Sequence, residues 1–291
     1  MVVKENPPIM VPYSTGRNYP KYEIPANACD SHHHIYDPVH YAYCPTDTRN
    51  QPPSTVDCYR MLQKRIGTER NVIIQPSVYK TDNRCTLAAL AEMGDNTRAI
   101  VVIDNTTTDA ELQEMDRAGV RGVRLNINCG GSNDWDMIQK LAERIAPLNW
   151  VMCFWMSPEL VVEKEEFLRS LPCQICFDHR GHIPAAGGVD HPACQIICRM
   201  LKEEKCWVKL SGLYIDTNCE DYADTIKVGQ AYVAANVNRC LWGTDWPHPS
   251  SYSGRKPMPN DVDMLDDLMI QAGSEENFRK ILVDNPAKLF F

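Results

Sequence analysis

The sequence lacks several features that would assign it to common protein classes. No apolar run comes near the roughly 18 residues that a membrane-spanning helix needs. The opening residues, MVVKENPPIMVPYSTG, have no apolar core followed by a small-residue cleavage site, so we expect no secretory signal. Basic residues are outnumbered, and the net charge of −8 argues against nucleic acids and anionic membranes as partners.

Two further absences concern organisation. The chain has no internal linker and no low-complexity tract, and 291 residues is an ordinary length for a single barrel domain. Its 13 cysteines are an odd number in a long chain, unlike the even sets of small disulfide-bonded domains. We interpret them as reduced thiols that serve as small apolar residues in a cytoplasmic protein.

From residue 27 onward, short apolar runs alternate with amphipathic stretches. Residues 1–26 are polar and rich in proline, and we expect them to form an arm on the surface. The eight runs with the character of strands are 27–35, 71–77, 98–104, 120–126, 150–156, 173–178, 206–212 and 239–245. Helix-like segments between them are 82–94, 108–119, 134–146 and 157–171, and Thr108 with Glu111 looks like an N-terminal cap.

This alternation predicts a single α/β domain, a (β/α)8 TIM barrel, over residues 27–291. The alternative is an open doubly wound sheet, but no glycine-rich phosphate loop follows the first run. The polar segment 39–60 is long for a loop, and on a barrel it would lie over the active site.

Each apolar run ends in polar residues, and active sites of such barrels lie at the C-terminal ends of the strands. The polar residues at the run ends are His32, His34, Gln75, Ser77, Arg124, Asn126, Trp155, Asp178, His179, Ser211 and Asp245. Side chains alternate along a strand, so His32 and His34 share a face and His33 points away. We expect His32, His34, His179, Arg124 and Asp245 to converge at the mouth of the barrel.

The same alternation makes predictions for two other strands. In the second run, Val72 and Ile74 should pack outward, which leaves Gln75 and Ser77 facing in. In the seventh run, the apolar residues at 208 and 210 should pack outward, which places Lys209 and Ser211 inside.

Four motifs carry a resemblance to a known family. The segments DSHHHIYDP (30–38), FDHRG (177–181), LWGTDWPHP (241–249) and DNPAKLF (284–290) resemble the second amidohydrolase family. The resemblance covers about residues 27–291. It implies a TIM barrel related to 2-pyrone-4,6-dicarboxylate lactonases, sulfomuconolactone hydrolases and galactarolactone isomerases.

This resemblance, together with the residues at the run ends, predicts hydrolysis of a small anionic lactone. Asp245 is the candidate general base for the attacking water, and His32, His34 and His179 would polarise the carbonyl group. Arg124 suits a substrate carboxylate. The remaining candidate substrate contacts are Ser77, Gln75, Tyr79, Asn126, Trp155, Ser211, His182 and His248.

A metal is the main alternative to this interpretation. His32, His34, His179 and Asp245 could hold Zn²⁺ or Mn²⁺. However, metal-bearing relatives resemble one another in carrying further ligands on the fourth and fifth strands, where this chain has Arg124 and Trp155. Because Arg124 would also repel a cation, we expect no required metal and no other cofactor.

The chain departs from the dicarboxylate lactonases at two positions. After the motif FDH they tend to read Met-Gly-Arg, whereas this chain reads Arg180-Gly181-His182. After KLSG they carry an arginine nearby, whereas this chain has LYID (213–216). We therefore expect a lactone with a single anionic group, a sugar-acid lactone or an aromatic-derived lactone in place of a substrate with two or three carboxylates. Two other reactions stay open, a metal-dependent decarboxylation and a lactone isomerisation, and the sequence leaves open whether the chain forms a homo-oligomer.

Overall fold

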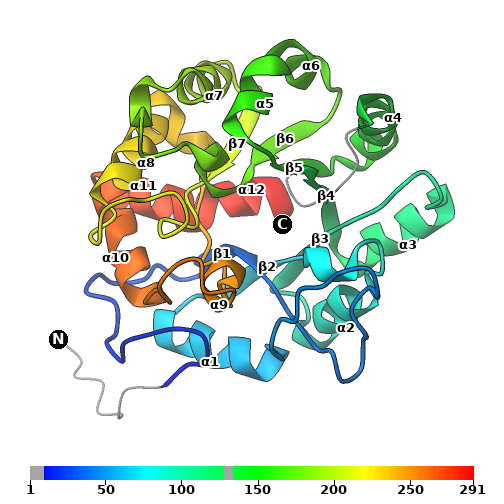
Figure 1. Cartoon of the computed structure of the whole chain (residues 1–291), viewed down its shortest axis with the longest axis horizontal. Helices are drawn as coiled ribbons and strands as arrows, with labels where there is room; N and C mark the ends of the chain where they lie inside the picture. Colours follow the sequence, from blue (N-terminus) through cyan, green and yellow to red (C-terminus); the bar gives the residue numbers. More distant parts are fainter. Residues whose placement is uncertain (1–9, 128–133) are drawn as a thin grey trace.

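Eight parallel strands follow one another around the sheet in the order of the chain, with helices outside them (Figure 1). The structure is a computed structural model, and it describes residues 10–127 and 134–291. The strands are β1 (Cys29–His33), β2 (Arg70–Ile74), β3 (Thr97–Val101), β4 (Val120–Asn126), β5 (Val151–Trp155), β6 (Gln174–Phe177), β7 (Cys206–Lys209) and β8 (Cys240–Leu241). Hydrogen bonds from Ser31 N to Trp242 O and from Asp245 N to His32 O join the end of β8 to β1. The predicted (β/α)8 barrel is confirmed.

The helices cover the outside and the two ends of the barrel. They are α1 (Val56–Ile66), α2 (Arg84–Met93), α3 (Asp109–Ala118), α4 (Trp135–Ile145), α5 (Pro158–Glu163), α6 (Glu165–Ser170), α7 (Pro192–Lys202), α8 (Ala223–Asn236), α9 (Pro249–Tyr252), α10 (Asp261–Ala272), α11 (Glu275–Arg279) and α12 (Asn285–Phe290). Thr108 and Glu111 form the predicted capping box at the start of α3. The segment 157–171 forms two helices instead of one, because the backbone of Lys164 leaves the helical region.

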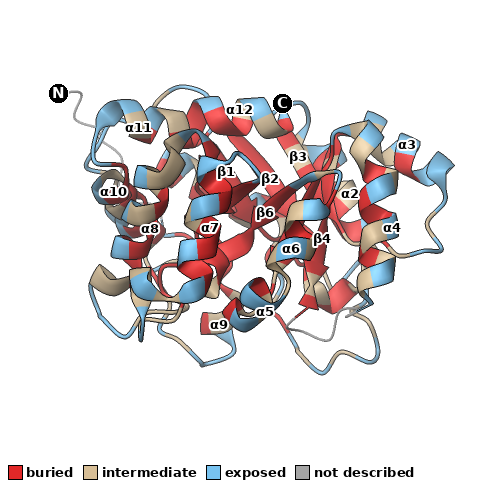
Figure 2. Cartoon of the chain, turned by 90° about the horizontal axis from the view of Figure 1, so that it is seen from above, coloured by how far each residue is buried: buried red, intermediate tan, exposed pale blue. Residues whose placement is uncertain are grey.

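The two ends of the barrel differ in polarity. One half of the interior is filled by an apolar cluster made of Cys29, Val72, Ile74, Ile100, Val151, Cys153, Cys176, Trp207, Leu241 and Phe290. Phe290 comes from α12, which lies at the opposite end of the barrel from α9 (Figure 2). The buried apolar half closes the α12 end, so a ligand can enter only at the end where the strands terminate in polar residues.

The orientation predicted for β2 is wrong. Val72 and Ile74 belong to the interior cluster, and Ile73 packs against the outer helices. Gln75 follows in the outward direction, and its amide nitrogen donates to the backbone oxygens of Lys80 and Asp82. A run of three apolar residues gave no alternation from which its inner face could be read.

The described part of the N-terminal arm, residues 10–26, lies against the barrel. Trp246 donates its indole N–H to Pro12 O at 2.8 Å, and Arg65 on α1 donates to the backbone oxygens of Thr15 and Gly16. Trp246 directly follows Asp245, so these contacts brace the segment after β8 that carries the candidate base.

Among the described residues, no helix is both long and apolar enough to span a membrane.

Candidate active site

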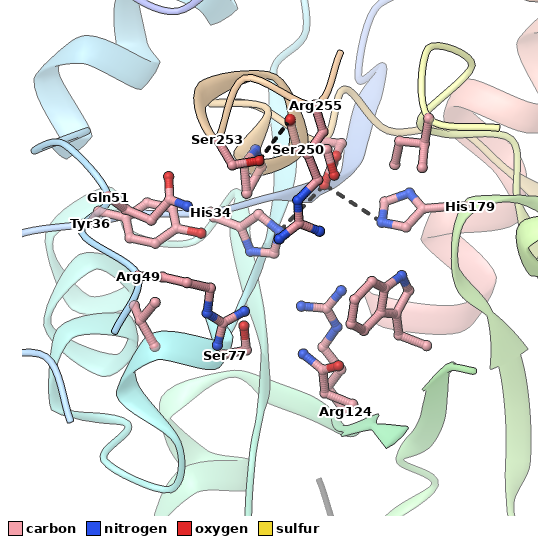
Figure 3. Close-up of a pocket in the computed structure, with 16 residues that line it drawn as sticks. His34, Tyr36, Arg49, Gln51, Ser77, Arg124, His179, Ser250, Ser253 and Arg255 are labelled. Carbon is pink, nitrogen blue, oxygen red and sulfur yellow. Dashed lines mark hydrogen bonds and ion pairs between the residues drawn. The ribbon is translucent and has the colours of Figure 1, made fainter. Parts of the chain in front are cut away.

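A cavity opens at the polar end of the barrel, and its volume is about 670 Å³ including the open mouth. It is within the size range of sites for small molecules. Its polar and aromatic lining residues are His34, Tyr36, Arg49, Gln51, Ser77, Arg124, Asn126, Trp155, His179, Asp245, Ser250, Ser253 and Arg255 (Figure 3). Four predicted substrate contacts, Arg124, Ser77, Asn126 and Trp155, are in this wall.

Three histidines surround one oxygen of Asp245 at the inner end of the cavity. The Nε2 atoms of His32, His34 and His179 lie 3.5, 3.4 and 3.6 Å from Asp245 Oδ1. All four side chains are buried. The predicted convergence of these residues at the barrel mouth therefore matches the geometry.

A local irregularity in β1 helps to set this arrangement. The register against β2 shifts between Asp30 and His33. His33 points outward as predicted, where its ring stacks on Tyr59 and its Nε2 lies 2.9 Å from Asn71 Oδ1. Asp30 accepts hydrogen bonds from Thr244 N and Thr244 Oγ1, which ties the end of β8 to β1. These contacts hold the strand ends that carry the histidines and Asp245.

The two carboxylate oxygens of Asp245 have different partners. Tyr214 donates its hydroxyl to Oδ2 at 2.6 Å, which leaves Oδ1 to face the histidines. Burial by itself would raise the pKa of Asp245, but His179, His34 and His32 hold it well below its usual range. The carboxylate is therefore ionised near neutral pH.

The histidines next to Asp245 are held in defined orientations by their second ring nitrogens. His34 Nδ1 lies 2.8 Å from Ile74 O, and a carbonyl oxygen can only accept, so Nδ1 carries the proton. A neutral His34 therefore presents a lone pair at Nε2. His179 Nδ1 contacts Ser211 Oγ at 2.9 Å, and burial lowers the pKa of His179 to about 3, so this ring is neutral near pH 7.

A buried charge cluster lies beneath the histidines. Asp178 Oδ1 is 3.0 Å from Lys209 Nζ, and Asp178 Oδ2 accepts from Arg124 Nε at 3.1 Å. Burial would raise the pKa of Asp178, but the charge of Lys209, followed by His32 and Arg124, holds it well below its usual range. Arg124 thus donates its Nε–H to Asp178, and the rest of its guanidinium group faces the cavity.

Two arginines on loops complete the cavity, and sequence reasoning missed both. Arg49 comes from the long segment after β1, and Arg255 follows α9. Figure 3 shows their guanidinium groups and that of Arg124 directed toward the middle of the cavity. Loops thus place in the cavity wall two arginines that the strand ends did not predict, and the guanidinium group of Arg49 is paired with the carboxylate of Asp47. Segment 39–60 was predicted to lie over the site, and this prediction could have identified Arg49 as a residue of the cavity wall.

Five of the predicted substrate contacts do not line the cavity. Gln75 lies on the outer side of β2, as described above. The other four are engaged elsewhere: Tyr79 Oη accepts from Asp37 N, Ser211 Oγ contacts His179, His182 Nδ1 lies 3.3 Å from Asp216, and His248 Nε2 lies 3.2 Å from Asp261. These side chains therefore hydrogen-bond to neighbouring residues and do not line the cavity.

The spacing of the ligand atoms suits a divalent cation, but their protonation does not. Tetrahedral zinc with bonds of about 2.0–2.1 Å places its ligand atoms roughly 3.4 Å apart, close to the separations around Asp245 Oδ1. His32 Nδ1, however, lies 3.3 Å from the ammonium group of Lys209, which can only donate. His32 then carries its proton at Nε2 and has no lone pair for a metal, so the set in this form does not fit a metal centre.

The whole barrel matches known proteins. The chain is 32% identical over 275 residues to a 4-sulfomuconolactone hydrolase of Hydrogenophaga intermedia, covering 93% of this chain and 90% of that protein. It is 27% identical over 275 residues to a D-galactarolactone isomerase of Agrobacterium fabrum, covering 93% of each. A solved apo structure from Agrobacterium tumefaciens superposes with a TM-score of 0.84 at 27% identity, covering 93% of this chain and 98% of that one. Residues 29–291 match the model of the amidohydrolase family, and the chain belongs to that family.

Proposed function

We propose that this hydrolase opens a small lactone that carries anionic groups, with Asp245 as the general base. One observation carries the proposal: a buried, ionised carboxylate oxygen faces three histidines, two of which line the cavity, and three arginines line the same cavity. The histidines and the carboxylate suit proton transfer and carbonyl polarisation, and the arginines suit an anion.

The reaction begins with a water molecule beside Asp245. Oδ1 of Asp245 and Nε2 of His34 lie 3.4 Å apart, so one water molecule at the inner end of the cavity can contact both atoms. Asp245 takes one proton as the water oxygen bonds to the lactone carbonyl carbon. His32 and His179 stabilise the negative charge that develops on the carbonyl oxygen.

The tetrahedral intermediate then collapses. The carbon–oxygen bond of the ring breaks, and Asp245 returns its proton to the leaving oxygen. The products are a hydroxyl group and a carboxylate in one open chain, with one proton released to solvent at neutral pH.

The arginines support a substrate with two anionic groups rather than one. Arg124 lies deep, beside Trp155 at the end of β4, and Arg255 approaches from the loop after α9. A guanidinium group binds a carboxylate or sulfonate through two parallel hydrogen bonds. The 4-sulfomuconolactone named for one relative is a lactone of this anionic kind.

We further propose that the reaction requires no metal, because the protonation of His32 does not suit a cation, as described above. A cytoplasmic location is part of the same proposal. None of the described cysteines forms a disulfide, in keeping with a reducing compartment.

A panel of lactones tests the function. Each compound, with no, one or two anionic groups, is incubated with the enzyme while proton release is followed, with and without a chelator. We expect the highest kcat/KM for a dianionic lactone and no loss on chelation. Proton NMR of the product separates hydrolysis, which gives a hydroxy acid, from isomerisation, which gives another lactone. Release of carbon dioxide, or activity abolished by the chelator and restored by Zn²⁺ or Mn²⁺, would contradict the proposal.

A further inference from the structure

Lys209 is a buried charge that neither substrate nor solvent reaches. It ends β7 beneath the cavity, its side chain is 0% exposed, and it does not line the cavity. Its Nζ lies 3.0 Å from Asp178 Oδ1 and 3.3 Å from His32 Nδ1. Burying an ammonium group is costly unless its partners compensate for the lost water. Packing alone therefore does not explain why a lysine is buried at this position.

The charge state of Lys209 decides what it can do to His32. Burial by itself would lower the pKa of Lys209, but the carboxylate of Asp178 raises it above the ordinary value. The group is an ammonium ion, with three donors and no acceptor. Its contact with His32 Nδ1 therefore requires a lone pair on that nitrogen.

His32 has only one proton to place. Its Nδ1 lies 3.3 Å from the ammonium group of Lys209, a contact that a doubly protonated ring could not accept. With a lone pair at Nδ1, the proton is on Nε2, which faces Asp245 Oδ1. The competing acceptor for a proton at Nδ1 is Asp178 Oδ1, 3.4 Å away, but Lys209 Nζ lies closer to both atoms, 3.0 Å from Oδ1 and 3.3 Å from Nδ1.

His34 has the opposite tautomer. Its Nδ1 donates to Ile74 O, so a neutral ring has its lone pair at Nε2. Two histidines on one strand thus face the same carboxylate oxygen, one with a donor and one with an acceptor. A single reacting centre needs both: a donor for the developing oxyanion and an acceptor for the attacking water.

We infer that Lys209 is a positioning residue that keeps His32 in the Nε2–H tautomer, so that His32 donates to the reacting oxygen instead of binding a cation. The role in turnover rests on the proposed lactone hydrolysis, but the tautomer does not. Without Lys209, His32 Nδ1 can carry the proton and donate to Asp178, which turns the Nε2 lone pair toward Asp245 and His34. The Nε2 atoms of His32 and His34 and Oδ1 of Asp245 would then direct lone pairs at the same point, as the ligands of a zinc ion do.

The test replaces Lys209 with methionine, which keeps the length and removes the donors. ¹⁵N NMR of histidine-labelled enzyme reports which ring nitrogen of His32 is protonated, and the loss of signals in His32→Asn assigns them. We expect protonated Nε2 in the wild type and protonated Nδ1 in Lys209→Met. We also expect kcat to fall about 10²-fold or more with KM nearly unchanged, the effect of losing one oxyanion donor. Lys164→Met, at a surface lysine, is the matched control.

Titration with Zn²⁺ in a calorimeter gives a second readout without substrate. Lys209→Met should bind Zn²⁺ at least about tenfold more tightly than the wild type, or 1.4 kcal/mol. If the single variant does not fold, the double variant Lys209→Met/Asp178→Asn removes both buried charges, and its His32 is no longer held to Nε2–H. Lys209→Arg, which can also only donate, should restore the wild-type tautomer.

Three results would overturn the inference: protonated Nδ1 in the wild type, an unchanged tautomer in Lys209→Met, or a stoichiometric metal retained by the wild type through purification. If no lactone is hydrolysed but the NMR result is as expected, the proposed function fails and the inference about the tautomer stands.

Discussion

The substitution Asp245→Asn tests the centre of the proposed mechanism. It exchanges one oxygen for a nitrogen in a side chain of the same shape, and Tyr214 can still donate to the remaining oxygen. The variant lacks a base to take the proton from water. It keeps the three histidines, whose Nε2 atoms lie 3.4–3.6 Å from the substituted group, and it keeps the arginines.

The size of the effect follows from these contacts. A positioned general base contributes about 10²–10⁴ to the rate, so kcat should fall by that factor, equivalent to about 3–5 kcal/mol. KM should change by less than about threefold, because the anion-binding arginines are untouched. Stability should change little, since asparagine has the same shape as aspartate and keeps the hydrogen bond from Tyr214.

The assay is proton release at saturating substrate, with circular dichroism to confirm the fold. Asp266→Asn is the matched control, because Asp266 is a buried carboxylate on α10 that accepts from Lys21 N. It should retain full kcat. If Asp245→Asn turns over within about tenfold of the wild type, Asp245 is not the base and the mechanism is wrong.

Further predictions concern substrate charge, acid stability and packing. Arg124→Met should raise KM by about tenfold or more with a smaller change in kcat; a loss confined to kcat would instead place its contact in the transition state. Arg255→Met should raise KM for dianionic lactones only, and an equal effect on neutral lactones would exclude an anion-binding role. Burial lowers the pKa of His33 to about 3, against about 6.5 in the unfolded chain, so its neutral form stabilises the fold above about pH 6.5 and this contribution is lost as the pH falls toward 3. In urea titrations at several pH values, His33→Gln should therefore lose stability less steeply on acidification, by about 1.4 kcal/mol per pH unit, and an unchanged slope would refute this. Gly122→Ala should destabilise the barrel by about 3 kcal/mol in the same assay, because its Cβ would lie 2.2 Å from Val151 O; a midpoint equal to the wild type would show that β4 and β5 can separate at no cost.

The barrel and the centre of its site follow from local sequence patterns. Alternating apolar runs and amphipathic stretches predict a (β/α)8 barrel because each pattern has the period of one element. The pair His32 and His34 could be placed in the mouth because side chains two residues apart share a face of a strand. His33 was predicted to point outward for the same reason, and it does.

The alternation gave a wrong prediction where consecutive residues of a strand are all apolar. Val72, Ile73 and Ile74 are all apolar, so nothing in the run shows which of them face the barrel interior, and the error carried over to Gln75. Arg49 and Arg255 lie on loops, which have no periodicity that would point a side chain toward the cavity.

By itself, the sequence determined that a carboxylate and a pair of histidines meet at the end of a barrel, because strand order and alternation are local properties. Only the tertiary structure decided what each group can do there. Ile74 O accepts a hydrogen bond from His34 Nδ1, Lys209 Nζ lies beside Nδ1 of His32, and Tyr214 donates to Oδ2 of Asp245. These partners come from strands and loops far apart in the chain, and the direction of a hydrogen bond depends on the atom that folding brings opposite each nitrogen or oxygen.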